Sequence, residues 1–117
     1  MIRIKRVYES MGSENEMRIL IDRLWPRGIR KDQLEPDAWY KEVAPSNQLR
    51  MWFGHDPGKW DEFKERYFAE LDSRPEALGP LLELARSGNI TLLYGAKNKE
   101  HNNAIALKDY LESKLQK

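Results

Sequence analysis

The stretch ITLLYGA, residues 90–96, decides the fold. It is apolar and β-prone, and a glycine follows the run directly, which predicts a buried strand that ends in a turn. Residues 18–24, RILIDRL, contain a second continuous apolar run, as expected of a strand covered on both faces. Residues 2–8, IRIKRVY, alternate well enough to suit a third strand.

The polar connector between residues 2–8 and 18–24 leaves the arrangement of these two strands open. It is too short for a crossover helix, which a pair of parallel neighbours would need. The two strands therefore form a hairpin, or the connector runs back extended.

The pattern turns helical from residue 31 to residue 88. Residues 36–45, bounded by a proline at each end, predict a short helical segment. Ser46 is the expected N-cap of a second short helix, which Gly54 ends.

Asp56 and the proline after it predict the start of the next helix. That helix carries an apolar stripe at spacings of three, four and four: Trp60, Phe63, Tyr67 and Leu71. Ser73 and Glu76 have the spacing of a capping box, which predicts another helix start. The Gly-Pro pair at 79–80 predicts a kink or a split in that helix, and Gly88 its end.

The segment KNKEHNN, residues 97–103, predicts a loop in which the last helix begins near Asn98. The apolar positions of that helix are Ala104, Leu107, Leu111 and Leu115. Together these elements predict an α/β fold: a small three-stranded, mostly parallel sheet with a multi-helix insertion between the second and last strands. We expect residues 1–117 to form a single domain, which is near the usual domain size.

Composition and charge exclude several classes of protein. Hydrophobic residues make up 40% of the chain and charged residues 33%, as in ordinary soluble globular proteins. The net charge of +1 argues against binding of nucleic acid by bulk electrostatics. The chain has no cysteine and two histidines, so we expect no disulfide, no thiolate nucleophile, no metal site and no cofactor. With no signal peptide and no apolar run long enough to cross a bilayer, we expect a cytoplasmic protein that does not bind a membrane.

Two expected strand ends carry charged side chains. The segment DRLWPRG, residues 22–28, places Arg23 and Arg27 where one strand ends, and Lys97 follows the strand at 90–94. Ligands of open α/β sheets bind outside the carboxyl ends of the strands, and helix N-termini favour anions. If the two strands are parallel neighbours, these three cations converge on one crevice, with Asn98 and Asn102 at the start of the last helix. The alternative is structural: Arg23 pairs with Asp22 or Glu100, and Arg27 binds nearby carbonyls.

Three residues are candidates for proton transfer: Asp22, His55 and His101. His55 stands beside Asp56, which invites a general base with an orienting carboxylate. Asp56 already serves as an N-cap in this interpretation, so the alternative is that His55 is an exposed loop residue. No pair of carboxylates has a convincing acid–base spacing.

Several segments together resemble the DUF488 family in its short, YeaO-like branch. They are ILIDRLWPRGI (19–29), WFGHDP (52–57) and LLYGAKNKEHN (92–102), and the similarity covers essentially the whole chain. The resemblance implies a small α/β cytoplasmic domain and supplies no known reaction. Longer members carry a Cys-His-Arg element after the last strand. The corresponding residues here, 100–103, read EHNN, so a thiol mechanism does not carry over.

Three functions follow as hypotheses. The first is a ligand-binding or enzymatic domain that recognises a phosphate- or carboxylate-bearing small molecule. The second, not favoured, is a nucleic-acid-associated or regulatory module in which Trp25 stacks on a base and these residues contact phosphates: Arg3, Lys5, Arg6, Arg23, Arg27, Arg30 and Lys31. The third is a protein-binding module with Trp25 exposed as the anchor. Binding to several phosphates would weaken steeply with salt, which separates the first two.

Overall fold

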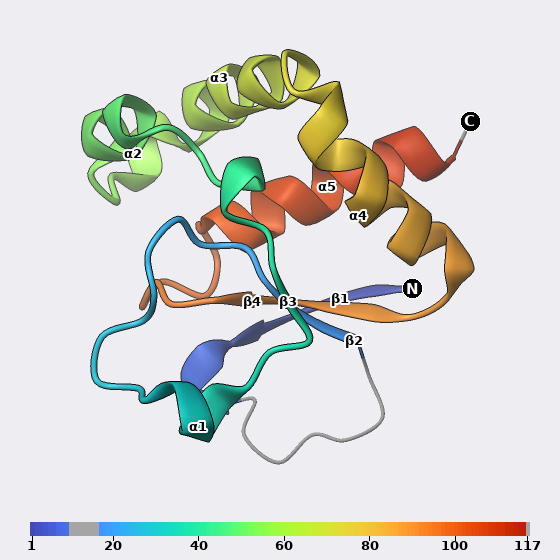
Figure 1. The fold of residues 1–117 in the computed structure, drawn as a ribbon. Helices are drawn as coiled ribbons and strands as arrows, with labels where there is room; N and C mark the ends of the chain where they lie inside the picture. Colours follow the sequence, from blue (N-terminus) through green and yellow to red (C-terminus); the bar gives the residue numbers. More distant parts are fainter. Residues whose placement is uncertain (10–16, 117) are drawn as a thin grey trace.

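We analysed a computed structural model of the chain, which describes residues 1–9 and 17–116 (Figure 1). Its centre is a sheet of four parallel strands in the order β1-β4-β2-β3. The strands are β1 (Ile2–Arg6), β2 (Met17–Leu20), β3 (Ala38–Trp39) and β4 (Ile90–Tyr94). The expected α/β class with a parallel sheet is therefore confirmed, and the expected strand number of three is wrong.

The strand missed by sequence analysis is β3, which was expected to be helical. It has only two residues, too few to show any period. Backbone hydrogen bonds hold it beside β2, from Asp37 N to Arg18 O at 2.9 Å and from Tyr40 N to Leu20 O at 2.9 Å. A short 3₁₀ turn, Lys41–Val43, follows it. The strand conformation of this segment is therefore determined by the pairing of β3 with β2, which is a tertiary contact.

The strands β1 and β2 are parallel and flank β4, so the hairpin alternative is wrong. Most of the connector between them lies outside the described residues. All five residues of β4 are buried, as its apolar sequence predicted. Ile90, Leu92 and Tyr94 face the larger core, and Leu93 faces the smaller one on the other side of the sheet.

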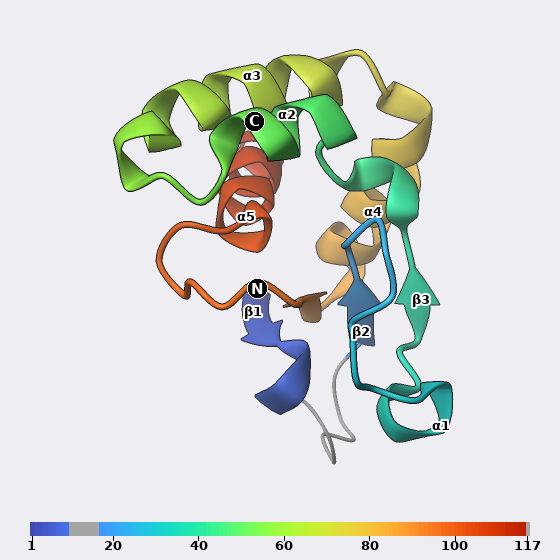
Figure 2. The ribbon, with the colours of Figure 1, turned by 90° about the vertical axis from the view of Figure 1, so that its left-hand side faces the viewer.

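Four helices cover one face of the sheet, above it in Figures 1 and 2: α2 (Asn47–Phe53), α3 (Trp60–Asp72), α4 (Pro75–Ser87) and α5 (Asn103–Leu115). The short α1 (Lys31–Leu34) lies below. Ser46 accepts from Leu49 N and caps α2, and Gly54 ends that helix in the left-handed conformation, as expected. The apolar stripe of α3 is confirmed, with Phe63, Tyr67 and Leu71 buried.

The expected cap of α4 is wrong, and so is the alternative that the Gly-Pro pair splits this helix. Ser73 does not cap α4: its hydroxyl donates to Glu70 O at the end of α3, and Arg74 occupies the N-cap position. α4 is one helix that contains Pro80, so the Gly-Pro pair does not split it. Within the described residues, no helix combines the length and apolar character that a bilayer crossing requires.

Candidate functional site

A cleft of about 410 Å³ lies at the carboxyl ends of β2 and β4, where α5 begins. This is the edge of a parallel sheet at which ligands usually bind. Polar and charged side chains that line it are Tyr8, Asp22, Arg23, Arg27, Arg50, His55, His101, Asn102 and Asn103. Six of the eight residues predicted for the site are among them. Lys97 and Asn98 do not line the cleft.

Asp22, two residues beyond β2, ties together the elements that meet at the cleft. Its Oδ2 accepts from Gly95 N at 2.8 Å, in the turn after β4, and its Oδ1 accepts from Asn103 Nδ2 at 3.0 Å, at the start of α5. Burial raises the pKa of Asp22, against the opposing effects of these two hydrogen bonds and of the nearby Arg50 charge. The geometry makes Asp22 a positioning group for the cleft.

Arg23 pairs with neither Asp22 nor Glu100, the partners that the structural alternative named. Its Nη2 lies 3.4 Å from the carbonyl oxygens of both Ala44 and Pro45, which are long contacts. Its Nε is buried and finds no hydrogen-bond partner in the described part of the chain. A buried donor without an acceptor is costly, so this guanidinium has unused capacity to bind an anion.

Arg27 and Arg50 bring the number of arginines in the cleft to three. Over residues 1–9 and 17–116, none of the three has an ion pair with a carboxylate within 4.0 Å, whereas seven other ion pairs are present. Among the described residues, Asp22 is the one acidic side chain that lines the cleft. The three arginines and Asp22 of this described lining sum to a formal charge of +2.

The start of α5 differs from the expectation. The helix begins at Asn103, not near Asn98, and Asn102 is its N-cap, with Oδ1 accepting from Ile105 N at 3.0 Å. Asn98 instead shapes the preceding turn, since its Oδ1 accepts from Glu100 N and His101 N. Because this turn separates the strand from the helix, Lys97 lies exposed beyond the cleft.

The two histidines approach the cleft from different elements. His55 follows the end of α2 with a φ of 59°, in the left-handed region that is uncommon for residues other than glycine. Its ring lies 6.2 Å from that of Phe53. His101 lies edge-on to Trp60, with ring centroids 5.1 Å apart. Both histidines and Asp22 line the same cleft. A shared role in proton transfer requires that they lie in one site.

Tyr8, Arg50 and Asn103 are the polar and charged site residues that sequence analysis did not select. Arg50 lies on α2, far along the chain from either strand end. A charged residue on a predicted helix is usually expected to face solvent, so Arg50 gave no sign of a binding site. Asn103 is the first residue of α5, and its contact with Asp22 spans 81 residues of sequence. The EHNN segment was the only local signal for Asn103, and no pattern near Arg50 could have identified it.

Trp25 is half-buried, so it does not form an exposed anchor. Its Nε1 donates to Ile29 O at 2.6 Å, and its ring lies edge-on to Trp39 at 5.5 Å. It packs on the smaller core, with Leu34 and Leu93.

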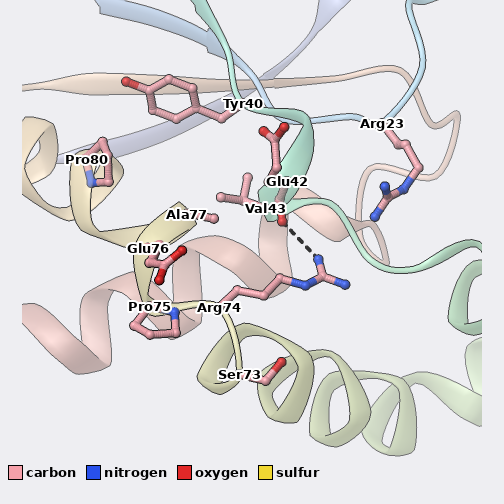
Figure 3. A pocket seen from close by; sticks show the side chains of 10 residues that line it. All are labelled: Arg23, Tyr40, Glu42, Val43, Ser73, Arg74, Pro75, Glu76, Ala77 and Pro80. Atoms are coloured by element: carbon pink, nitrogen blue, oxygen red, sulfur yellow. Dashed lines mark hydrogen bonds between the residues drawn. The ribbon is translucent and has the colours of Figure 1, made fainter.

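A second cleft, of about 870 Å³, also has Arg23 in its lining (Figure 3). Arg74 dominates it, with Nη1 donating to Glu42 O and Ala44 O at 2.9 Å each. Arg74 also lies 3.8 Å from a carboxylate oxygen of Glu70. Its guanidinium is thus occupied within the protein, in contrast to that of Arg23.

The parallel sheet, with an arginine-lined cleft where its central strands end, defines a small α/β protein with a candidate binding cleft at the sheet edge. The chain belongs to the DUF488 family: the family model described as "Inactive DUF488-N3 subclade" matches residues 1–117. This confirms the resemblance seen in the sequence.

The chain is 43% identical to the uncharacterized protein YeaO of Escherichia coli (strain K12) over 112 residues, which is 96% of this chain and 97% of that protein. It is 37% identical over 113 residues to the uncharacterized proteins Mb3100c of Mycobacterium bovis and Rv3073c of Mycobacterium tuberculosis. Those alignments cover 97% of this chain and 95% of each relative. No solved structure matches the chain significantly.

Proposed function

We propose that this protein binds a small molecule bearing a phosphate or carboxylate group in the cleft at the ends of β2 and β4. One observation carries the proposal: Arg23, Arg27 and Arg50 line the cleft, and no carboxylate of the described residues forms an ion pair with them. Guanidinium groups recognise such anions through paired N–H donors.

Arg23 is the group that we expect to contact the anion most directly. Among the described residues its buried Nε has no acceptor, and its Nη2 makes only long contacts, with backbone carbonyls. A bound anion would supply the missing acceptor without breaking a strong interaction. Asp22 does not compete with a ligand for Arg23, because its two carboxylate oxygens already accept hydrogen bonds from Gly95 and Asn103.

The proposal is for binding and does not require a reaction. The chain has no cysteine, and the family model that it matches is described as inactive, both of which favour a ligand-binding role. Proton transfer by Asp22, His55 or His101 stays a prediction. The nucleic-acid alternative is less well supported. Two of the cations it needs already have partners: Arg6 donates to Ala96 O, and Arg30 pairs with Asp32.

The test is a thermal-shift screen followed by titration calorimetry with phosphate, sulfate, dicarboxylates and short oligonucleotides. It compares the wild type with Arg23→Gln, Arg50→Gln and Arg86→Gln. Arg86 is the matched control, since it lies on α4 outside both clefts and pairs with Glu83. We expect a small anion to bind and each cleft variant to weaken it about tenfold or more, the usual effect of losing a charged hydrogen bond. The Arg86 variant should bind as the wild type does.

Two outcomes would overturn the proposal. One is that no small anion binds the folded wild type. The other is that only oligonucleotides bind, with an affinity that falls steeply between about 50 and 200 mM salt, which would indicate contacts with several phosphates.

A further inference from the structure

The size of the cleft exceeds what an inorganic anion needs. Its volume of about 410 Å³ would otherwise hold roughly a dozen waters, at about 30 Å³ each. Pockets for small organic molecules start at about 300 Å³. An anion held by Arg23 alone would leave most of this space to solvent.

Apolar side chains line the cleft from two sides. On one side are residues of α2 and α3, where Phe53 and Phe63 stack with ring centroids 4.4 Å apart. On the other is the segment that follows β2, with Leu24, Trp25 and Pro26. Both phenylalanines are almost fully buried, so the apolar surface that a ligand can reach lies mainly at Leu24 and Trp25, where an apolar group gains by burial of surface.

Two exposed side chains at the cleft offer apolar surface to a ligand. Leu24 is 66% exposed and Tyr8 is 42% exposed, and both line the cleft. The Tyr8 hydroxyl donates to Arg27 O at 3.0 Å, which places its ring beside one of the arginines. Arg6 lies over the same ring, 4.6 Å from its centroid. An apolar ligand body here would lie next to the cationic groups.

The charge of the lining indicates which class of anion the cleft favours. Over the described residues, the three arginines and one carboxylate of the lining sum to a formal charge of +2, which matches the dianion of a phosphate monoester better than a single carboxylate. Resting on the proposed function, we infer that the ligand is a phosphate monoester of an aromatic body. Its phosphate contacts Arg23 and Arg50, and its ring covers Leu24 and Tyr8.

The experiment is titration calorimetry with four probes: inorganic phosphate, methyl phosphate, phenyl phosphate and benzoate. Work at about pH 8 keeps the phosphates dianionic. We expect phenyl phosphate to bind about tenfold tighter than methyl phosphate, the ratio that burial of roughly 60 Å² of further apolar surface gives. Benzoate should bind more weakly than phenyl phosphate.

Two variants locate the ring. Leu24→Ser should remove most of the preference for phenyl over methyl phosphate and leave the affinity for methyl phosphate unchanged. Met51→Ser is the matched control, because Met51 is 75% exposed on α2 and does not line the cleft. It should change neither affinity.

The outcomes separate this inference from the proposed function. Equal affinity for methyl and phenyl phosphate would overturn the aromatic body and leave anion binding intact. Benzoate binding as tightly as phenyl phosphate would overturn the phosphate. A preference for phenyl phosphate that survives Leu24→Ser would overturn the placement of the ring. Failure of every anion to bind would refute the proposed function itself.

Discussion

Replacement of Tyr67 by Phe tests how the wall of the cleft is held. Tyr67 lies on α3 with no exposed surface, and its hydroxyl donates to Val43 O. Val43 is equally buried and belongs to the segment that carries Ala44 and Pro45 to the cleft. Burial raises the pKa of Tyr67, which keeps the phenol protonated as a donor. The variant deletes this donor and changes the packing volume very little.

The expected loss follows from these contacts. A net hydrogen bond is worth about 1 kcal/mol, and a buried group left without a partner costs about 1–3 kcal/mol. We therefore expect the free energy of unfolding to fall by about 2 kcal/mol, with the Val43 carbonyl dry and unpaired. For a chain of this size the melting temperature should fall by roughly 8 °C.

The assay is urea unfolding followed by tryptophan fluorescence, with melting by calorimetry. Tyr8→Phe is the control, because the Tyr8 hydroxyl is exposed and water can replace it at Arg27 O. That variant should lose less than about 0.5 kcal/mol. If Tyr67→Phe is as stable as the wild type, the hydroxyl is not holding the segment and the reasoning fails.

Three further predictions concern the carboxylate clamp and the helix cap. Burial raises the pKa of Asp22. The contribution of this side chain to the free energy of unfolding is therefore greatest at acid pH and declines as pH rises through the folded-state pKa. The stability of wild type relative to Asp22→Asn, from urea unfolding, should therefore fall from about pH 3 to pH 7; a rising difference would contradict this. Gly95→Ala brings a Cβ within 3.1 Å of Asp22 Oδ2 and should lower the free energy of unfolding by about 1 kcal/mol. It should also weaken phosphate binding, and an unchanged affinity would show that Asp22 need not hold this position. Ser46→Ala removes an acceptor of Leu49 N and a donor to Glu70, and should destabilise the protein by about 1–2 kcal/mol in the same unfolding assay; a neutral result would mean that water replaces both.

The elements that local chemistry defines could be predicted from the sequence. The strand β4 has an uninterrupted apolar run, and α3 has an apolar stripe at helical spacing. Ser46 and Gly54 marked the two ends of α2 because capping depends on residues within a turn of each other. The strand β3 and the N-cap of α4 depend on tertiary contacts, so local patterns led to wrong expectations there.

The candidate site divides in the same way. Asp22, Arg23 and Arg27 follow β2 directly, so the rule about carboxyl strand ends was enough to select them. Arg50 reaches the cleft only because the segment after β3 places α2 beside it. Lys97 was selected for its position after β4, and the turn shaped by Asn98 directs the chain so that it lies outside the cleft.

The two consecutive residues Asp22 and Arg23 show how the cleft combines rigidity with unused binding capacity. Asp22 accepts at 2.8 and 3.0 Å from groups of two other elements, so it fixes the shape of the cleft. Arg23 contacts two carbonyls at 3.4 Å, and its buried Nε is unpaired within residues 1–9 and 17–116, so it is held loosely. An anion bound as we propose would therefore meet a preorganised frame and a guanidinium whose existing contacts cost little to break. Because preorganisation reduces the cost of ordering on binding, the Asp-Arg pair suits a ligand site better than a purely structural role.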